Sequence, residues 1–228
     1  MNLFFENLAL RLKPAVFDLG GGQAVKLSGL VGAGKDKLVY RIQGRDEVLK
    51  VLREHRPGGE NAILQEISGE APVRNLGIAV VPSLRHDPRG RWAIKRYVPE
   101  PTVRHLIKAG SPLIYTEHFV RALFALTSTL RDAKVMMDLT PRNWVFRGDP
   151  EPAQLLSLEP ILLPALKKWG TFEETCLPLW LGSGPLFRIK AKRLATLRRS
   201  WEEDERFSCW RCYFGEAFPV LGPRWKID

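Results

Sequence analysis

The spacing of apolar residues changes along the chain, and this change constrains the fold more than any other feature of the sequence. Residues 24–27, 38–42, 78–84 and 92–98 are short apolar stretches separated by glycine, proline or charged residues, which predicts strands of a small antiparallel sheet. Residues 113–134 instead repeat apolar side chains at helical spacing, which predicts a long core helix. The sequence therefore predicts an α+β fold with a sheet-rich first half and a mainly helical second half.

Three shorter segments complete this expected organisation. Residues 60–68 have apolar positions on one helical face, which predicts a short amphipathic helix that Gly69 ends. Residues 144–146 and 154–158 are apolar and flank a turn-forming stretch, so they predict a small hairpin. Residues 186–205 predict a basic amphipathic helix near the end of the chain.

The composition is typical of a globular protein that does not cross a membrane. Hydrophobic residues make up 45% and charged residues 26% of the 228 positions. A charged residue interrupts every apolar segment, so none approaches the roughly 18 residues that span a bilayer. Residues 1–13 lack a basic leader and a small-residue cleavage site, so we expect a cytoplasmic protein. We also expect a monomer. Signal-independent secretion as an effector stays open.

The chain is strongly basic, with a formal net charge of +10. This sign favours acidic partners such as a nucleotide, a nucleic acid, an anionic lipid or lipopolysaccharide, or an acidic protein surface, but it does not choose among them. Nucleic-acid binding would use the cations of the last predicted helix, although a solvated helix face is the commoner explanation. Those cations are Arg188, Lys190, Lys192, Arg193, Arg198 and Arg199.

Three cysteines give an odd count, and two of them form the segment Cys209-Trp-Arg-Cys212. This pair is compatible with half a zinc site, a redox pair or two buried thiols. We expect buried thiols, because no second cysteine or histidine pair stands at ligand spacing and Cys176 is isolated.

Two segments of the first half are candidates for binding a polyanion. Gly32 and Gly34 lie in a strand-turn-strand segment, where glycine lets a backbone approach a ligand closely but is also an ordinary turn residue. Lys50 stands in the middle of the apolar stretch Val48–Leu52, which makes it either a site residue or a solvent-facing lysine. Each segment alone is weak evidence for a function.

The segment Asp138-Leu-Thr-Pro-Arg-Asn143, followed by an apolar strand, is the strongest candidate for chemistry. It resembles the catalytic loop of protein kinases, in which an asparagine stands five positions after an aspartate. The glycine segment, Lys50, a helix glutamate, a hinge and this loop also follow one another in the order of that superfamily, over Leu30–Pro160. The chain therefore resembles the protein-kinase-like superfamily, and within it the small bacterial effector kinases.

The resemblance implies a two-lobed fold, with an N-lobe over residues 1–98 and a reduced helical C-lobe over 99–228. It also implies ATP and Mg²⁺ as cofactors, and transfer of phosphate to a hydroxyl acceptor such as an acidic protein substrate. At the nucleotide, Lys50 would hold the α- and β-phosphates and pair with Glu60, with Glu66 as the alternative partner. The complete set at the nucleotide is Gly32, Gly34, Lys37, Val39, Lys50, Glu60, and the hinge backbone of Arg96, Tyr97 and Val98.

In the catalytic loop, the resemblance implies that Asp138 orients the acceptor hydroxyl and that Asn143 supplies an oxygen to Mg²⁺. Arg142 would stabilise the charge of the transferring phosphoryl group. Met136 and Met137 replace the usual His-Arg pair, so no activation-segment phosphate is expected to be bound there.

The sequence departs from the family at two positions. Lys37 replaces the third glycine, where it either restores attraction for phosphate or faces solvent. The metal-binding aspartate is missing, and Glu159 is the expected magnesium ligand, with Ser157 as the other residue near that position. If Ser157 takes the metal position, the chain would be a pseudokinase or nucleotide-binding scaffold. Whether the acceptor is Ser, Thr, Tyr, a sugar or a lipid stays open.

Overall fold

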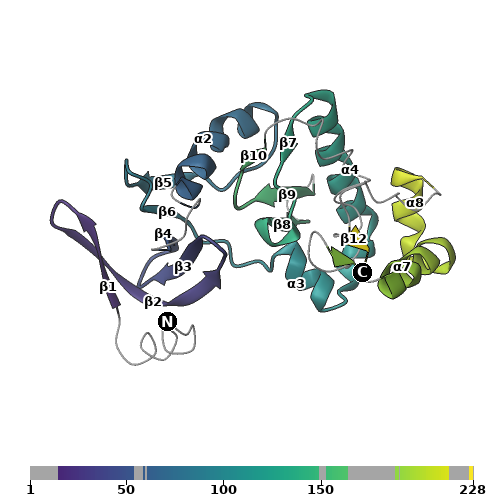
Figure 1. The fold of residues 1–228 in the computed structure, drawn as a ribbon, viewed down its shortest axis with the longest axis horizontal. Coiled ribbons are helices and arrows are strands. Elements are labelled where there is room, and N and C mark those ends of the chain that lie inside the picture. Colours follow the sequence, from purple (N-terminus) through teal and green to yellow (C-terminus); the bar gives the residue numbers. More distant parts are fainter. Residues whose placement is uncertain are drawn as a thin grey trace. The chain divides into compact units, whose positions relative to one another are not determined.

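The computed structural model describes residues 15–53, 59, 61–148, 153–163, 188–189, 191–215 and 226–227. These residues form a mixed α+β fold (Figure 1). The contacts between residues divide the chain into two compact units. The first contains the described residues of 1–70 and 81–99, and the second contains those of 71–80 and 100–228.

The first unit is built on a six-stranded antiparallel sheet with the strand order β1-β2-β3-β4-β6-β5. Its strands are β1 (Ala15–Gly20), β2 (Gln23–Ala33), β3 (Lys37–Ile42), β4 (Glu47–Leu52), β5 (Ser83–His86) and β6 (Trp92–Arg96). The predicted antiparallel sheet is confirmed, and β1 is a strand that the apolar pattern did not reveal. A core of Leu19, Val25, Leu27, Ile42, Leu49, Trp92 and Ile94 is buried against the sheet.

Helix α2 (Ala62–Asn75) is longer than the sequence predicted. Gly69 does not end it, and the helix continues through Pro72. The helix ends at Asn75, and Gly77, which has a φ of +78°, follows it. The Gly77 N–H donates to the Arg74 carbonyl at 2.8 Å and the Ile78 N–H donates to the Val73 carbonyl at 3.3 Å, the two bonds of a Schellman motif. The left-handed glycine, and not the first glycine in the pattern, therefore stops this helix.

The second unit is mainly helical, as predicted. Its longer elements are α3 (Val103–Lys108), α4 (Glu117–Asp132), β8 (Trp144–Arg147), β9 (Gln154–Ser157), α7 (Ala191–Glu203) and α8 (Ser208–Phe214). Two-residue strands form the pairs β7 (Met136–Met137) with β10 (Leu162–Leu163), and β11 (Arg188–Ile189) with β12 (Lys226–Ile227). The predicted hairpin is confirmed, because β8 pairs with β9 in antiparallel register.

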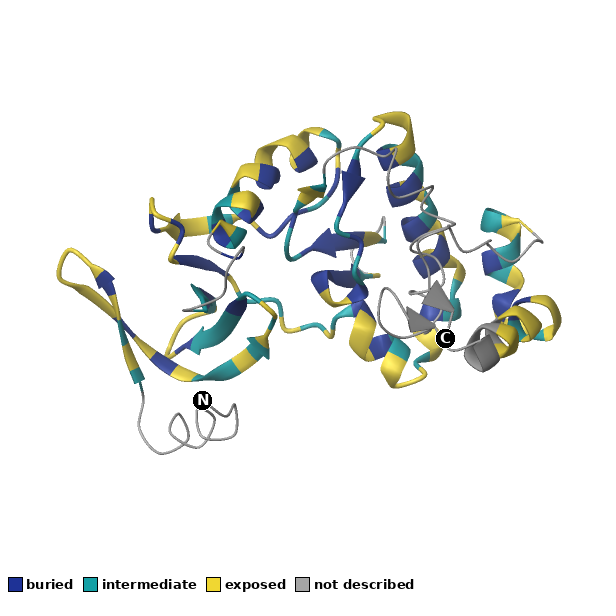
Figure 2. Cartoon of the chain, viewed as in Figure 1, coloured by how far each residue is buried: buried dark blue, intermediate teal, exposed yellow. Residues whose placement is uncertain are grey.

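Helix α4 carries much of the buried apolar surface of this unit (Figure 2). It begins later than predicted, because Pro112–Tyr115 form a 3₁₀ turn and the Thr116 hydroxyl then caps the helix. Trp144, Trp201 and Trp210 are fully buried in the same core. Among the described residues, no helix is both long and apolar enough to span a bilayer.

Candidate functional site

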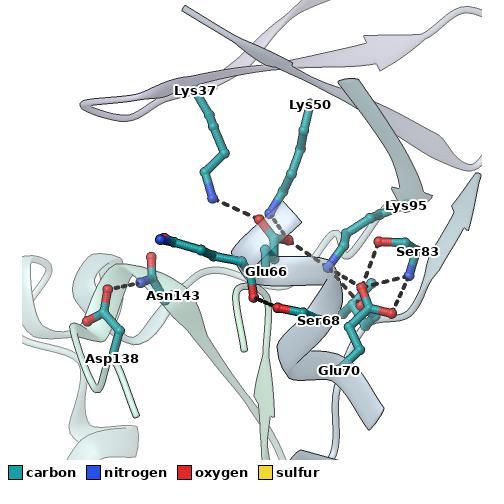
Figure 3. Close-up of polar contacts among 11 residues, drawn as sticks. Lys37, Lys50, Glu66, Ser68, Glu70, Ser83, Lys95, Asp138 and Asn143 are labelled. Carbon is teal, nitrogen blue, oxygen red and sulfur yellow. Dashed lines mark hydrogen bonds and ion pairs between the residues drawn. The ribbon is translucent and has the colours of Figure 1, made fainter. Parts of the chain in front are cut away.

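Three lysines from three strands of the first unit converge on Glu66 of helix α2 (Figure 3). Lys37 Nζ lies 2.8 Å from Glu66 Oε2. Lys50 Nζ and Lys95 Nζ each lie 2.6 Å from Oε1. All four side chains are buried, so these are ion pairs inside the unit and not on its surface.

The geometry of α2 explains why a charged residue faces the interior. Ile63, Glu66, Glu70 and Val73 are all buried, stand at intervals of three and four residues, and share one helix face. Two glutamates on that face break the apolar pattern, which is why the apolar spacing of Ile63, Leu64 and Ile67 had indicated a different face as the buried one.

Glu70 extends the cluster of Glu66 and its three lysines toward strand β5. Its carboxylate accepts hydrogen bonds from the Ser83 N–H at 3.0 Å and from the Ser83 hydroxyl at 2.6 Å. Lys95 Nζ lies 3.1 Å from Glu70 and donates to the Val81 carbonyl at 3.0 Å. Lys95 is therefore tied to the scaffold of the unit as well as to Glu66.

The electrostatic balance of the cluster keeps Glu66 ionised. Burial raises the pKa of the Glu66 carboxyl, but the attraction of Lys50, Lys95 and Lys37 outweighs burial and lowers that pKa overall. For Lys95, burial and then repulsion by Lys50 lower the pKa of the ammonium, against the attraction of Glu66 and Glu70.

These contacts change two expectations from the sequence. Lys50 is neither exposed nor solvent-facing, and its described partner is Glu66, the alternative choice. Glu60, the preferred partner, lies outside the described residues. Lys37 does not face solvent either, because its side chain is 8% exposed and bound to Glu66.

Of the two candidate glycines, Gly32 lies near the end of β2, opposite Val39, and Gly34 lies in the turn between β2 and β3. The Gly34 N–H donates to the Lys37 carbonyl at 2.8 Å and closes the turn. Neither Gly32 nor Gly34 has a positive φ. A Cβ at either position would meet its nearest neighbour at 3.5 Å, an ordinary contact distance. Neither the backbone angle nor the available space therefore requires glycine at these two positions. Val39 lies opposite Lys50 in the β3–β4 register.

At the expected hinge, strand β6 ends at Arg96, which is exposed. The Tyr97 N–H donates to the Asp46 carbonyl at 3.0 Å, and the Arg41 guanidinium lies 3.7 Å from the centre of the Tyr97 ring. An adenine contact through the Tyr97 N–H would have to replace that hydrogen bond. Val98 is half-buried beside it.

In the second unit, the residues of the Asp138 loop hold one another in place. Asp138 Oδ1 accepts hydrogen bonds from the Thr140 N–H at 2.9 Å and from the Thr140 hydroxyl at 2.5 Å. Asp138 Oδ2 accepts from Asn143 Nδ2 at 2.9 Å (Figure 3). The Trp144 indole N–H donates to the Asp138 carbonyl at 3.2 Å. Asp138 is half-buried, and its two partners orient both carboxylate oxygens.

The local sequence explains this loop. An aspartate readily accepts from the backbone N–H two positions later, and Pro141 is preset for the first position of the 3₁₀ turn Pro141–Asn143. Asn143 is buried, and because its Nδ2 donates to Asp138, its Oδ1 is the atom that would accept a cation. Arg142 is exposed in the same turn.

Few protein oxygens near the Asp138 loop are candidates for binding Mg²⁺. The Leu158 N–H donates to the Asn143 carbonyl at 2.8 Å. The half-buried Glu159 is the next residue in the chain after Leu158. Over the described ranges, no three His, Cys, Asp or Glu side chains gather as a metal site. Mg²⁺ is usually bound by one or two protein groups together with substrate phosphates and water, and Asn143 and Glu159 would be those groups here.

Ser157 ends strand β9, opposite Trp144. Its N–H donates to the Ala79 carbonyl at 2.9 Å. The side-chain hydroxyl is buried and has no hydrogen-bond partner among the described residues. A hydroxyl cannot supply the charge of a carboxylate to a cation, so Ser157 does not match the missing aspartate.

The cysteine expectation is wrong in part. Cys209 is half-buried but Cys212 is exposed, and both thiols are free. Both lie in α8, and Cys209 is the one that packs against the hydrophobic core. Cys176 lies outside the described residues. Of the basic residues of the late helix, Arg198 and Arg199 are exposed, and the other four side chains lie outside the described part.

Sequence reasoning missed Lys95, Glu70 and Ser83. A signal for two of them existed. Lys95 directly follows the apolar run Trp92–Ile94 within the segment predicted as a strand. Glu66 and Glu70 are four residues apart, which places them on one helix face. Comparison with protein-family models and with curated proteins finds no match to this chain.

Proposed function

We propose that this chain is an ATP- and Mg²⁺-dependent phosphotransferase, and that its two units correspond to the lobes of a minimal protein-kinase-like fold. The observation that carries the proposal is the 2.6 Å ion pair between Lys50, in the middle of a strand, and Glu66, on the buried face of a helix. Phosphoryl transfer by protein kinases requires such a strand-lysine and helix-glutamate pair to be in place.

In this proposal, Lys50 binds phosphate oxygens of ATP and Glu66 positions its ammonium. The turn at Gly32 and Gly34 supplies a backbone without side chains for close approach to phosphate. This role is supported by the fact that the turn requires glycine for neither its φ angles nor its space.

Asp138 receives the hydrogen bond of the acceptor hydroxyl and orients it for attack. Thr140 and Asn143 hold the carboxylate while it does so. Arg142, exposed in the same turn, would stabilise negative charge on the transferring group. Asn143 Oδ1 and Glu159 would hold Mg²⁺, which supplies charge neutralisation at the phosphates when bound. The favoured acceptor is a Ser, Thr or Tyr hydroxyl of an acidic protein, because the chain is strongly basic.

The experiment is incubation with labelled ATP and Mg²⁺, together with a cell lysate or the protein alone, followed by identification of the labelled species. Lys50→Met and Asp138→Asn should each lower transfer by about a hundredfold or more. Lys26→Met and Asp132→Asn are matched controls, since both residues are exposed on regular elements. Full activity in both site variants would contradict the proposal.

A nucleotide-binding scaffold without transfer is the second candidate. It is favoured by one observation, the neutral Ser157 hydroxyl near the expected metal position. A thermal shift produced by ATP, without turnover in the labelled assay, would select this candidate over the enzyme.

A further inference from the structure

The ammonium of Lys95 is enclosed by oxygens of the protein, and the side chain is only 2% exposed. Lys95 Nζ lies 2.6 Å from Glu66 Oε1, 3.1 Å from Glu70 Oε1 and 3.0 Å from the Val81 carbonyl oxygen (Figure 3). An ammonium has three N–H donors, so these three oxygens match its full hydrogen-bonding capacity. Lys95 therefore acts on the protein itself and not on a substrate.

The strand register explains why Lys95 and Lys50 reach the same carboxylate. In the pairing of β4 with β6, Lys50 lies opposite Ala93 and Lys95 lies opposite Val48. Opposite residues of an antiparallel pair point to the same face of a sheet, so the two lysines are diagonal neighbours on one face. Both side chains run toward α2 (Figure 3). Each ammonium then lies 2.6 Å from the same atom, Glu66 Oε1.

Sharing one oxygen restricts where the Lys50 ammonium can lie. A carboxylate oxygen has two lone-pair directions, and two ammonium groups repel each other. Because Lys95 takes one side of Glu66 Oε1, Lys50 is confined to the other side. Lys95 also contacts Glu70, one turn further along α2, and so holds this helix at two points. The Glu66 carboxylate cannot turn away from Lys50 without breaking contacts of Lys95.

We propose that Lys95 is a positioning residue for phosphoryl transfer: it fixes α2 against β6 and holds Glu66 where that carboxylate aligns the Lys50 ammonium. The inference rests on the proposed function, because there Lys50 is the group that binds the phosphates of ATP. All of these residues belong to the first unit, so the pair of Lys50 and Glu66 is aligned inside that unit. Lys95 acts on the reaction only through Glu66.

The test is the rate of phosphate transfer from labelled ATP by the full chain carrying Lys95→Met. Methionine is similar in size to lysine, and Lys37 and Lys50 then balance the charges of Glu66 and Glu70, so we expect this variant to fold. Transfer should fall by about tenfold or more, because a small displacement of an aligned group is enough for such a loss.

Ile94→Ala is the matched control for a loss of stability alone. Ile94 precedes Lys95 on β6, is 1% exposed and belongs to the apolar core of the first unit, so its side chain points to the other face of the sheet. The control variant should unfold at a lower temperature than the wild type, yet keep the wild-type transfer rate when assayed below that temperature. Lys95→Met should lose transfer at a temperature where circular dichroism shows it folded.

A double-mutant cycle with Glu66→Gln measures whether Lys95 acts through Glu66. In that background the carboxylate that Lys95 aligns is gone, so adding Lys95→Met should change transfer by less than about twofold. An equal loss from Lys95→Met in both backgrounds would mean that Lys95 acts by packing, and would overturn the inference.

Full transfer by folded Lys95→Met would overturn the inference as well. If that variant does not fold, Glu70→Gln decides instead, because it weakens the second point at which Lys95 holds α2. Glu70→Gln should lower transfer by about threefold, the value of one modest hydrogen bond, and unchanged transfer would contradict the inference.

These failures leave the phosphotransferase proposal intact as long as Lys50→Met and Asp138→Asn lower transfer. Absence of transfer by the wild type, or full activity in both of those variants, would remove the proposed function and the inference together.

Discussion

Glu66 in the first unit and Asp138 in the second are both held tightly, but by different kinds of donor. Three ammonium groups hold Glu66, which is buried at 1% exposure. Neutral donors hold the half-buried Asp138, namely the Thr140 N–H, the Thr140 hydroxyl and the Asn143 side-chain amide. A buried carboxylate among cations is part of what keeps its unit folded, whereas a partly exposed carboxylate among neutral donors is more easily replaced.

The largest effect on stability is therefore expected at Glu66. Glu66→Gln leaves three buried ammonium groups without the negative charge that they share, and breaking a buried ion pair in this way costs about 3–5 kcal/mol. Denaturant unfolding of the purified variant measures this loss. A cost below that of Asp138→Asn would contradict the contrast between the two carboxylates.

The same carboxyl makes the stability depend on pH. Because the folded-state pKa of Glu66 is lowered from its usual 4.5, its contribution is fully present above pH 4.5 and is lost as the pH falls toward the folded pKa. The difference in unfolding free energy between wild type and Glu66→Gln should shrink steadily below pH 4.5. A difference that stays constant down to pH 3 would mean that the ion pairs do not hold Glu66 ionised.

Asp138→Asn tests the other side of the comparison. It keeps the shape of the side chain and an oxygen for Thr140, so its cost in stability should be about 1 kcal/mol, the value of an ordinary hydrogen bond. Transfer of phosphate should nevertheless fall by about a hundredfold or more, because the group that orients the acceptor is gone. Unfolding and labelled-ATP assays on one preparation separate the two effects.

The costs in stability of replacing one glycine in each unit compare how closely the two units are packed around those glycines. Gly90 has a φ of +70° and a Cβ there would lie 2.6 Å from Leu64, whereas Gly110 has a φ of +63° and open space around it. Gly110→Ala should cost about 1 kcal/mol from backbone strain alone. Gly90→Ala should cost about 2 kcal/mol or more, because the α2 side chain must also move. Equal costs by denaturant unfolding would contradict the close packing at Gly90.

The smallest expected effect is a gain in stability at Lys134. This residue has a φ of +53° after helix α4, where the Val135 N–H donates to the Leu130 carbonyl at 3.0 Å. Lys134→Gly should stabilise the protein by about 0.5–1 kcal/mol, since glycine adopts this angle without strain. Lys134→Ala keeps the strain and serves as the control. If the melting temperature of the glycine variant does not rise, the backbone at Lys134 is not strained.

The sequence by itself determined the features that depend on local spacing. Strands β2, β3, β4 and β6, helix α4 and the β8–β9 hairpin follow from apolar periodicity and turn residues, and the structure confirms them. The strand predicted over 78–84 was wrong in its bounds, because β5 covers Ser83–His86 instead. The internal hydrogen bonds of the Asp138 loop are equally local, since Thr140 and Asn143 lie within five residues of the aspartate. The resemblance to kinases and the roles that it implies stay predictions.

Only the tertiary structure decided which charges meet. Glu66 and Lys95 are 29 positions apart, and Lys37 lies 29 positions before Glu66. Whether such residues touch depends on which face of α2 is buried and on the order of strands in the sheet, and neither follows from a local pattern. The end of α2 belongs here too, because both Gly69 and Gly77 are glycines and only the packing of Val73 and the chain after it selects the left-handed one.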